Sequence, residues 1–427
     1  MLHNASASTT VQDRPLLLLG AGASTYREHL LQRFAAQRPV VLADSEQPDW
    51  VRPYVHDQLI VDLADTEGAS AAVKRYAEQT PLSGIGTYME HHVVLAARLA
   101  RQLGLPGADP EAVAACRDKA ESRRRFAAHG VPSADSQLAE DQEAAVEIAR
   151  RIGYPVVVKP RGMAGSAGVV KATTDDQVRS AFQRAGWETV LGLDSYAVPG
   201  VLVEEYLSGP EISAETVVCG GEVTVVAITR KQLGPEPRFL EVGHCVDASD
   251  PLLADAKVTA AVTDAVRALG LEVGVLHIEM RLTRRGPALI EVNARPGGDL
   301  IPVLVAHATG IDLAGAATSL ATGSVPDLTP IRQRAAAVRF AYPDRSGVVT
   351  RLYAPASLRF EAWLERLVFT RQPGDQAVTP PQSISERLAH WVVTGADRSE
   401  CERRLAAVRS QIALEVGAPT RTTNCSR

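Results

Sequence analysis

Apolar and polar residues alternate in two neighbouring segments near the middle of the chain, Val275–Leu282 and Ala288–Arg295. This period of two is typical of β-strands, and the Thr283–Pro287 segment between them carries a Gly-Pro turn signal. The pattern therefore predicts a β-hairpin with one apolar and one polar face. Residues on the apolar face are expected to lie on the core: Leu276, Ile278, Met280, Leu282, Ile290, Val292 and Ala294.

The polar face of this hairpin carries the strongest chemical signal in the chain. Folding the hairpin about Arg285 places Glu279 opposite Glu291, and the same register places His277 opposite Asn293. Two carboxylates directly opposite each other repel, so a hairpin selected only for stability would avoid the pair. Oxygen ligands from the two glutamates and the asparagine amide suit Mg²⁺, which would remove this repulsion. The alternative is an ordinary solvated face on a surface hairpin.

The N-terminal part alternates short apolar runs with helical patterns, which predicts a doubly wound α/β domain. Its expected strands are Leu16–Leu19, Val40–Ala43, Ile60–Val61 and Gly84–Tyr88, and its expected helices are Tyr26–Gln37, Ala69–Glu78 and Val93–Leu103. Gly20 and Gly22 precede the first helix, as in a dinucleotide-binding unit, but Thr25 stands where that fingerprint has its third glycine. The favoured interpretation is a glycine turn that lines one wall of a substrate cleft.

Helical and strand patterns alternate less regularly through the rest of the chain. A charged helical pattern covers Asp109–Ala128, and Leu253–Leu269 is a long helical pattern that leads into the hairpin. The C-terminal part predicts strands at Ala336–Ala341 and Val348–Tyr353, and a final strand at Trp391–Thr394 before a helix at Glu400–Ile412.

Composition is that of a globular protein, with 45% hydrophobic and 22% charged residues among 427. The formal net charge of −5 gives no basic footprint for nucleic acid. No apolar run has the length of a membrane span, and the N-terminus lacks the basic and apolar parts of an export signal. Five scattered cysteines without metal-type spacing indicate reduced thiols, so a cytoplasmic protein is expected.

A second chemical signal follows the apolar strand that ends at Lys159. Backbone N–H groups in a glycine-rich loop can fold over anionic oxygens, and a lysine at the strand end adds a positive charge. The sequence is not a Walker A loop, and a glycine-containing hairpin loop without ligand is the alternative. The loop contains Gly162, Gly165, Ser166 and Gly168.

The run from His277 to Asp299, HIE…LIEVNARPGGD, resembles the metal-binding hairpin of the ATP-grasp superfamily, most closely the carboxylate–amine ligases that join amino acids. The resemblance implies that ATP binds with one or two Mg²⁺ ions, for which Mn²⁺ could substitute. It assigns Glu279, Glu291 and Asn293 to the metal, and it implies that Arg295 steadies an acyl phosphate.

The same resemblance implies contacts with ATP. The lysines are expected to reach the phosphates and the glycine loop to form a flexible lid over them. Glu204 is expected at the adenine edge, Glu205 and Leu207 at backbone contacts, and Glu211 at the ribose hydroxyls. The complete set is Lys119, Lys159, Gly162, Gly165, Ser166, Gly168, Glu204, Glu205, Leu207 and Glu211.

Substrate contacts are also implied by the resemblance. Glu241 and His244 are expected to contact the amino-acid substrates, and either could be the base for the attacking amine. The remaining residues assigned to the substrate end are Glu90, Lys231, Gly297 and Gly298.

The expected fold class is α/β, in an ATP-grasp composite with α+β central domains. Its expected parts are a disordered lead (1–13), an N-terminal domain (14–108), a lid region (109–208), a central metal and substrate region (209–323) and a C-terminal subdomain (324–427). The expected activity is ADP-forming ligation of a carboxylate, an amino acid, to an amine, a second amino acid. Alternatives are bicarbonate-dependent N-carboxylation on the same fold and a non-catalytic nucleotide-binding regulator. The partners are these small molecules, with no nucleic acid or membrane, and relatives are commonly homodimers.

Overall fold

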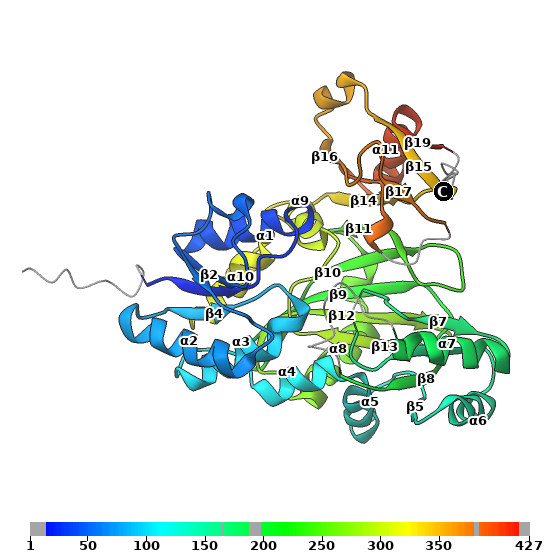
Figure 1. Cartoon of the computed structure of the whole chain (residues 1–427), viewed down its shortest axis with the longest axis horizontal. Helices are drawn as coiled ribbons and strands as arrows, with labels where there is room; N and C mark the ends of the chain where they lie inside the picture. The colour runs from blue at the N-terminus through cyan, green and yellow to red at the C-terminus, as the bar shows by residue number, and fades with distance from the viewer. Residues whose placement is uncertain (1–13, 164, 188–197, 380–383, 418–427) are drawn as a thin grey trace, which may run out of the picture.

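A parallel sheet forms the N-terminal part, in the strand order β3-β2-β1-β4 (Figure 1). The computed structural model describes residues 14–163, 165–187, 198–379 and 384–417, so the predicted disordered lead lies outside the described residues. Its strands are β1 (Leu16–Leu19), β2 (Val40–Asp44), β3 (Asp57–Ile60) and β4 (Gly84–Gly86). Its helices are α1 (Ser24–Gln37), α2 (Thr66–Gln79) and α3 (Val93–Gln102). The predicted α/β alternation is confirmed.

Both faces of this sheet are buried, as parallel sheets require. Leu17 and Leu19 pack under α2 and α3, whereas Leu16 and Leu18 pack under α1. A helix from much later in the chain, α10 (Leu313–Ala321), completes the second face, and a Cβ on Gly84 would lie 2.1 Å from the Ala321 carbonyl oxygen. Glycine at position 84 therefore allows α10 to approach β4 closely.

The charged segment 109–128 is helical, as its pattern predicts, but it is divided into two helices, α4 (Pro110–Arg117) and α5 (Lys119–Ala128). Asp118 separates them in an extended conformation, with φ −101° and ψ 99°. Its carboxylate accepts hydrogen bonds from the backbone N–H groups of Ala120 and Glu121 and caps α5.

A four-stranded antiparallel sheet, in the order β5-β8-β6-β7, follows α5. Helices α6 (Gln142–Ile152) and α7 (Asp175–Trp187) cover one of its faces with a core of small aliphatic side chains. Its strands are β5 (Ser136–Ala139), β6 (Val156–Pro160), β7 (Val170–Ala172) and β8 (Val201–Glu205). The glycine loop connects β6 to β7, so this sheet carries the predicted lid.

An eight-stranded antiparallel sheet, in the order β13-β12-β9-β10-β11-β14-β18-β16, forms the centre of the molecule (Figure 1). Helix α8 (Ala256–Leu269) covers one face, and α9 (Ile301–Thr309) covers the other together with α10. Its strands are β9 (Glu211–Cys219), β10 (Glu222–Leu233), β11 (Glu241–Asp247), β12 (Val273–Thr283), β13 (Gly286–Asn293), β14 (Ala335–Ala341), β16 (Leu364–Phe369) and β18 (Ala389–Gly395).

The C-terminal part also forms a small sheet, in the order β17-β15-β19, beside α11 (Arg398–Gln411). Its strands are β15 (Gly347–Tyr353), β17 (Gln376–Ala377) and β19 (Ala413–Gly417). The strand at 391–394 is therefore not the last one, because β19 follows α11 and places Val416 against Val349. Over the described residues, no single helix has the length and apolar composition to cross a membrane; α9 and α10 pass only as a pair bent by 104°.

Register in the β12–β13 hairpin confirms the predicted pairs, Glu279 with Glu291 and His277 with Asn293. A β-bulge after Glu279 then shifts the register by one residue and pairs Met280 with Leu289. Leu289 therefore lies in the core and Ile290 does not, so the prediction for Ile290 is wrong.

Candidate active site

The two opposed glutamates of the hairpin each pair with a buried lysine. Lys231, on β10, places its Nζ 2.9 Å from a Glu279 carboxylate oxygen. Lys119 places its Nζ 2.9 Å from Glu291 Oε1 and donates to the Met163 carbonyl oxygen at 2.6 Å. Lys119 is the first residue of α5, so the break that Asp118 makes in the helix also positions this lysine.

His277 connects Glu279 to a second buried carboxylate on the neighbouring strand. Its Nε2 lies 3.0 Å from Glu279 Oε1, and its Nδ1 lies 3.0 Å from Glu215 Oε2. Glu215 also accepts hydrogen bonds from the hydroxyl groups of Ser213 and Thr229. Burial alone would lower the pKa of His277, but the two carboxylates raise it to about 9. Protonated His277 therefore carries charge between them.

Glu215 was not predicted as a site residue, although β9 gives a signal for it. Glu211, Ser213 and Glu215 alternate with apolar residues, so all three lie on the same face of the strand. That face meets the polar face of the hairpin, since β9 pairs His277 with Glu215 and Glu279 with Ser213.

The predicted metal ligands fit a hard divalent cation by their donor chemistry. Glu279 and Glu291 supply carboxylates from directly opposite positions, and the buried Asn293 supplies an amide oxygen beside them. Within the described residues, no group of three or more His, Cys, Asp or Glu side chains is arranged to hold a metal. The expected set needs only two such residues, because Asn293 and substrate phosphates supply the other oxygens.

Arg295 meets Glu90 from the N-terminal domain. Arg295 Nε lies 2.5 Å from Glu90 Oε2, and Arg117 Nη1 donates to Glu90 Oε1 at 3.0 Å. Burial would raise the pKa of Glu90, but the two guanidinium groups outweigh it and hold the pKa at about 2. Arg117, which was not predicted as a site residue, also donates to the Gly162 carbonyl oxygen at 3.0 Å. This cluster joins the N-terminal domain, the lid loop and the hairpin.

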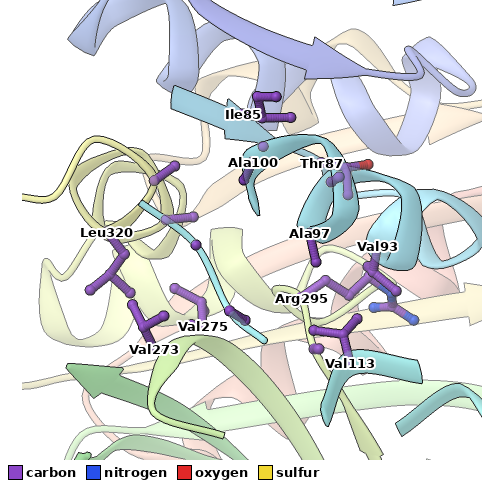
Figure 2. A pocket seen from close by; sticks show the side chains of 18 of the residues that line it. Ile85, Thr87, Val93, Ala97, Ala100, Val113, Val273, Val275, Arg295 and Leu320 are labelled. Atoms are coloured by element: carbon purple, nitrogen blue, oxygen red, sulfur yellow. The ribbon is translucent and has the colours of Figure 1, made fainter. Parts of the chain in front are cut away.

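Arg295 also borders an apolar cavity of about 110 Å³ between α3, α10 and β12 (Figure 2). Thr87 and Arg295 contribute the only polar side chains among its described lining residues. Figure 2 shows Ile85, Val93 and Val275 on its walls. These walls offer almost no hydrogen-bond partners for phosphate or carboxylate groups. We therefore expect the phosphates and the substrate carboxylate to bind next to the β12–β13 hairpin and not in this cavity.

Lys159 and Glu204 form a buried ion pair in which Lys159 Nζ lies 2.5 Å from Glu204 Oε2. Arg123 donates to Glu204 Oε1 at 3.0 Å and to the Ile290 carbonyl oxygen at 2.7 Å. Burial, together with Arg123 and Lys119, lowers the pKa of Lys159 to about 8, although Glu204 opposes this change. Arg123 was not predicted; it follows Lys119 by four residues on α5, so the two share a helix face.

Lys231 lies among three carboxylates that were all predicted as site residues. Its Nζ lies 3.0 Å from Glu211, 2.9 Å from Glu279 and 3.4 Å from Glu241. Burial would lower the pKa of Lys231, but these three carboxylates raise it well above its usual value. Glu211 also pairs with Arg281 at 2.9 Å.

Glu205 and Leu207 lie at the exit of β8. The Glu205 side chain pairs with Arg285 at 2.5 Å, and its backbone N–H donates to the Asp135 carbonyl oxygen. Leu207 packs with Ala134, Ala288 and Ile290 in a small apolar cluster. The bulge that removes Ile290 from the main core therefore places it against this cluster.

The glycine loop turns sharply, with left-handed φ values at Gly165 (67°), Ser166 (57°) and Gly168 (69°). Residue 164 lies outside the described residues. At the start of the loop, a Cβ on Gly162 would lie 2.5 Å from the Val198 backbone nitrogen. Hydrogen bonds from Arg117 and Lys119 to carbonyl oxygens at the start of the loop direct these cations toward the lid.

Glu241 and His244 lie on β11, beside the loop that follows the hairpin. His244 Nε2 lies 3.5 Å from Asp299 Oδ2. Burial raises the pKa of Glu241, and Lys231 offsets this only in part. Gly297 packs against the histidine of the hairpin, since a Cβ there would lie 3.0 Å from His277 Nδ1, whereas a Cβ on Gly298 would meet no atom within 4 Å.

Three family models match the chain. An ATP-grasp domain covers residues 152–303, an ATP-grasp N-terminal domain covers residues 37–107, and L-amino acid ligase C-terminal domain 2 covers residues 339–417. The first match includes β6, the lid loop and the whole hairpin.

Several relatives of the chain are named as ligases or synthases. An uncharacterized protein of Sinorhizobium fredii is 30% identical over 81% of this chain and 72% of its own length. Alanine–anticapsin ligase of Bacillus subtilis is 30% identical over 64% of this chain and 60% of its own length. Human carnosine synthase 1 is 26% identical over 77% of this chain, which spans only 42% of that enzyme.

Solved structures show the same fold. An L-amino acid ligase from Bacillus licheniformis superposes with a TM-score of 0.81 over 96% of this chain and 100% of its own, at 21% identity. A phosphoribosylglycinamide synthetase from Anaerococcus prevotii gives 0.72 over 95% of this chain and 100% of its own, at 19% identity. The resemblance and the fold expected from the hairpin are confirmed, and the chain belongs to the carboxylate–amine ligase family of the ATP-grasp superfamily.

Proposed function

We propose that this enzyme uses Mg-ATP to activate the carboxylate of one amino acid and joins it to the amine of a second, releasing ADP and phosphate. The observation that carries the proposal is the hairpin, where Glu279 and Glu291 face each other and each pairs with a buried lysine. The match to an L-amino acid ligase C-terminal domain supports amino acids as the substrate class. A relative named as an alanine–anticapsin ligase supports it further.

Glu279, Glu291 and Asn293 would hold the Mg²⁺, with Mn²⁺ as the expected substitute. When bound, the metal would supply charge neutralisation for the phosphoryl transfer. Lys119 pairs with Glu291 and lies under the lid loop, so it can turn from the carboxylate to a phosphate oxygen. Lys231, held by Glu211 and Glu241 as well, keeps the Glu279 carboxylate ionised and in place.

In the first step, a substrate carboxylate oxygen attacks the γ-phosphorus and the bond to the β,γ-bridging oxygen breaks. ADP leaves, and the acyl phosphate remains. Positioning and charge neutralisation supply most of the catalysis in such a transfer. Lys119 and Lys159 would neutralise the phosphate oxygens. Arg295, anchored by Glu90, would hold the acyl phosphate through its remaining N–H groups.

In the second step, the amine attacks the acyl carbon, the bond from carbon to the phosphate oxygen breaks, and phosphate leaves. The amine nitrogen must also lose a proton. Glu241 is the stronger candidate for this base, because burial raises its pKa toward the working range of a general base. His244 is the second candidate. Closure of the glycine loop would exclude water, which would otherwise hydrolyse the acyl phosphate.

The test is incubation of the purified protein with Mg-ATP and pooled L-amino acids. ADP and phosphate release are followed, and products are identified by mass spectrometry. A product with the mass of two amino acids minus water supports the proposal and identifies both substrates. Omission of Mg²⁺ should abolish both ADP release and product.

Two results would overturn the proposal in different ways. ADP release only when bicarbonate is supplied, with a carboxylated product, would assign the alternative N-carboxylation. ATP binding without Mg²⁺-dependent ADP release under either condition would assign a nucleotide-binding regulator.

A further inference from the structure

A buried ion pair joins the loop after the hairpin to the C-terminal part of the chain. Arg387 Nη1 donates to Asp299 Oδ1 at 2.8 Å, and Arg387 Nη2 donates to Asp299 Oδ2 at 2.6 Å. The Arg387 side chain is 1% exposed, and its guanidinium carbon lies 3.6 Å from the centroid of the Phe340 ring. A bidentate pair on an aromatic face holds both side chains in one geometry.

The loop that this pair holds has an unusual backbone. Asp299 and Leu300 have left-handed φ values of 51° and 66°, which residues other than glycine rarely adopt. Leu300 precedes α9 and provides no side-chain cap for it. Such a conformation persists only when its surroundings hold it. The Arg387 guanidinium holds the Asp299 carboxylate through two hydrogen bonds and is therefore placed to do so.

The same arginine reaches the strand that carries the proposed base. Arg387 Nε donates to the Tyr342 hydroxyl at 3.1 Å, and that hydroxyl donates to the Glu241 carbonyl oxygen at 3.1 Å. Asp299 also faces His244 at 3.5 Å. One guanidinium therefore fixes the loop that begins at Arg295 relative to the strand of Glu241 and His244.

We propose that Arg387 is a positioning residue that aligns the acyl-phosphate side of the active site with the amine side. It contacts the loop through Asp299 and β11 through Tyr342, and it reaches no predicted ATP or metal ligand by any described contact. We call the contacts of Arg387 with Asp299 and Tyr342 the Arg387 clasp. Weakening these contacts should leave phosphoryl transfer from ATP largely intact. The amine then captures less of the acyl phosphate, and water captures more. The catalytic part of this inference rests on the proposed function.

The test compares Arg387→Lys with the wild-type enzyme. Lysine keeps the positive charge but loses the planar fork that binds both carboxylate oxygens. We expect the amide formed per ADP released to fall by about threefold or more, while the KM for ATP changes by less than about twofold. A smaller amount of folded enzyme would lower the amounts of amide and ADP equally and leave their ratio unchanged. The ratio therefore distinguishes an effect on alignment of the site from an effect on protein stability.

Arg404→Lys is the matched control. Arg404 also belongs to the C-terminal part, pairs with Glu400 at 2.8 Å and lies 5.4 Å from the Trp363 ring centroid. Its substitution should leave the ratio of amide to ADP unchanged. If Arg387→Lys does not fold, Tyr342→Phe removes only the hydroxyl that links Arg387 to Glu241 and should lower the ratio in the same direction.

Hydrogen–deuterium exchange tests the role of the Arg387 contacts in a way that does not depend on catalytic activity. The backbone N–H groups of Ile301, Val303 and Leu304 donate to carbonyl oxygens of Gly298 and Leu300. These amides should exchange faster in Arg387→Lys, and in Tyr342→Phe to a smaller extent, but not in Arg404→Lys. If the wild-type enzyme makes no amide, the proposed function is wrong, but the exchange experiment still measures whether Arg387 holds the loop. If Arg387→Lys leaves the exchange of these amides unchanged, or leaves the amide formed per ADP unchanged in an active enzyme, Arg387 is not a positioning residue.

Discussion

Arg295 is held by Glu90, a residue from a different part of the chain, and this anchoring leads to the first prediction. Arg295→Ala should lower kcat by roughly a hundredfold or more, because its donors stabilise charge in the acyl phosphate. The Kd for Mg-ATP should change by less than about threefold, since Lys119 and Lys159 remain. Stopped-flow ADP release and calorimetric titration with ATP measure the two quantities.

Folding must be checked in the same variant, because the buried Glu90 then keeps Arg117 as its only described guanidinium partner. Arg295→Lys keeps the charge and serves as the control for stability. Equal losses in kcat and in ATP affinity would contradict the role of Arg295 at the acyl phosphate.

His277 predicts a dependence of stability on pH. Its pKa is raised to about 9 in the folded protein, against about 6.5 for an unfolded histidine. The protonated ring therefore stabilises the fold fully below pH 6.5, and this contribution disappears as the pH rises to about 9. In metal-free buffer, the stability advantage of wild-type protein over His277→Gln should shrink by roughly 3 kcal/mol across this range.

Urea unfolding at several pH values measures this difference. His129→Gln is the control, because His129 is exposed and bonds only to its own helix among the described contacts. Unfolding free energies of wild-type protein and His277→Gln that stay parallel between pH 6.5 and 9 would show that the ring does not bridge Glu215 and Glu279.

A local pattern was sufficient for the hairpin pair, whereas the other site residues were assigned mainly from the resemblance to the ATP-grasp superfamily. Glu279 and Glu291 lie on one hairpin, so their alternation and the turn were sufficient to pair them. Arg123 and Arg387 reach their partners from other parts of the fold, and Glu215 reaches His277 from the neighbouring strand β9. In each of these three pairs the two partners lie far apart in the sequence, so no local period relates them. Their roles became visible only in the folded chain.

At the scale of elements, the β-bulge in the hairpin gives two neighbouring residues opposite surroundings. Leu289 lies in the main core, and Ile290 packs against the small cluster that contains Leu207. Leu289→Ala should destabilise the fold by about 2–5 kcal/mol and leave ATP binding almost unchanged. The resemblance implies that Leu207 lies at the bound ATP, so Ile290→Ala, which removes packing next to Leu207, should destabilise the fold less than Leu289→Ala but weaken ATP binding by about fivefold.

Thermal unfolding and ATP titration of the two variants provide the comparison. The reverse pattern, with Ile290→Ala the more destabilising substitution, would mean that the hairpin keeps a regular register. Alternation alone could not predict the bulge, since it inserts one residue without changing the pattern of the strand before it.

Element boundaries were predictable where the pattern is long and uniform. The strand at Leu16–Leu19 and the helices of the N-terminal domain are of this kind. The break at Asp118 was not predicted, because the residues on both sides favour a helix and only the aspartate side chain ends one helix and starts the next. β19 was missed because its sequence, ALEVG, is not a continuous apolar run like Leu16–Leu19 and follows a helix directly.

At the scale of the molecule, the C-terminal part and the hairpin share one sheet. β14, β18 and β16 extend the eight-stranded sheet beyond β11, so the sheet runs from the proposed metal ligands to the C-terminal part. Composition alone suggested a separate subdomain from 324 onward, since strand pairing between distant segments leaves no local signal. The boundaries of the five predicted parts stay a prediction.

This shared sheet predicts the effect of truncation. A chain ended after residue 323 would expose the edge of β11 and the apolar faces that β14 and β18 cover. We expect it to aggregate, as judged by gel filtration and circular dichroism. A chain ended after residue 417 keeps every described element and should behave as the full chain does. A stable, folded 323-residue product would show that the C-terminal part is dispensable for the sheet.

Closure of the N-terminal sheet by α10 has a consequence for synthesis on the ribosome. β1 to β4 emerge early, but one face of their sheet packs on Ala314 and the end of α10, which are translated much later. The nascent domain therefore has this sheet face covered by α1 but not yet by α10 during much of elongation, and exposed apolar surface of this kind favours aggregation over folding. Chaperone binding to ribosome-stalled chains should consequently persist until residues beyond 321 have left the exit tunnel.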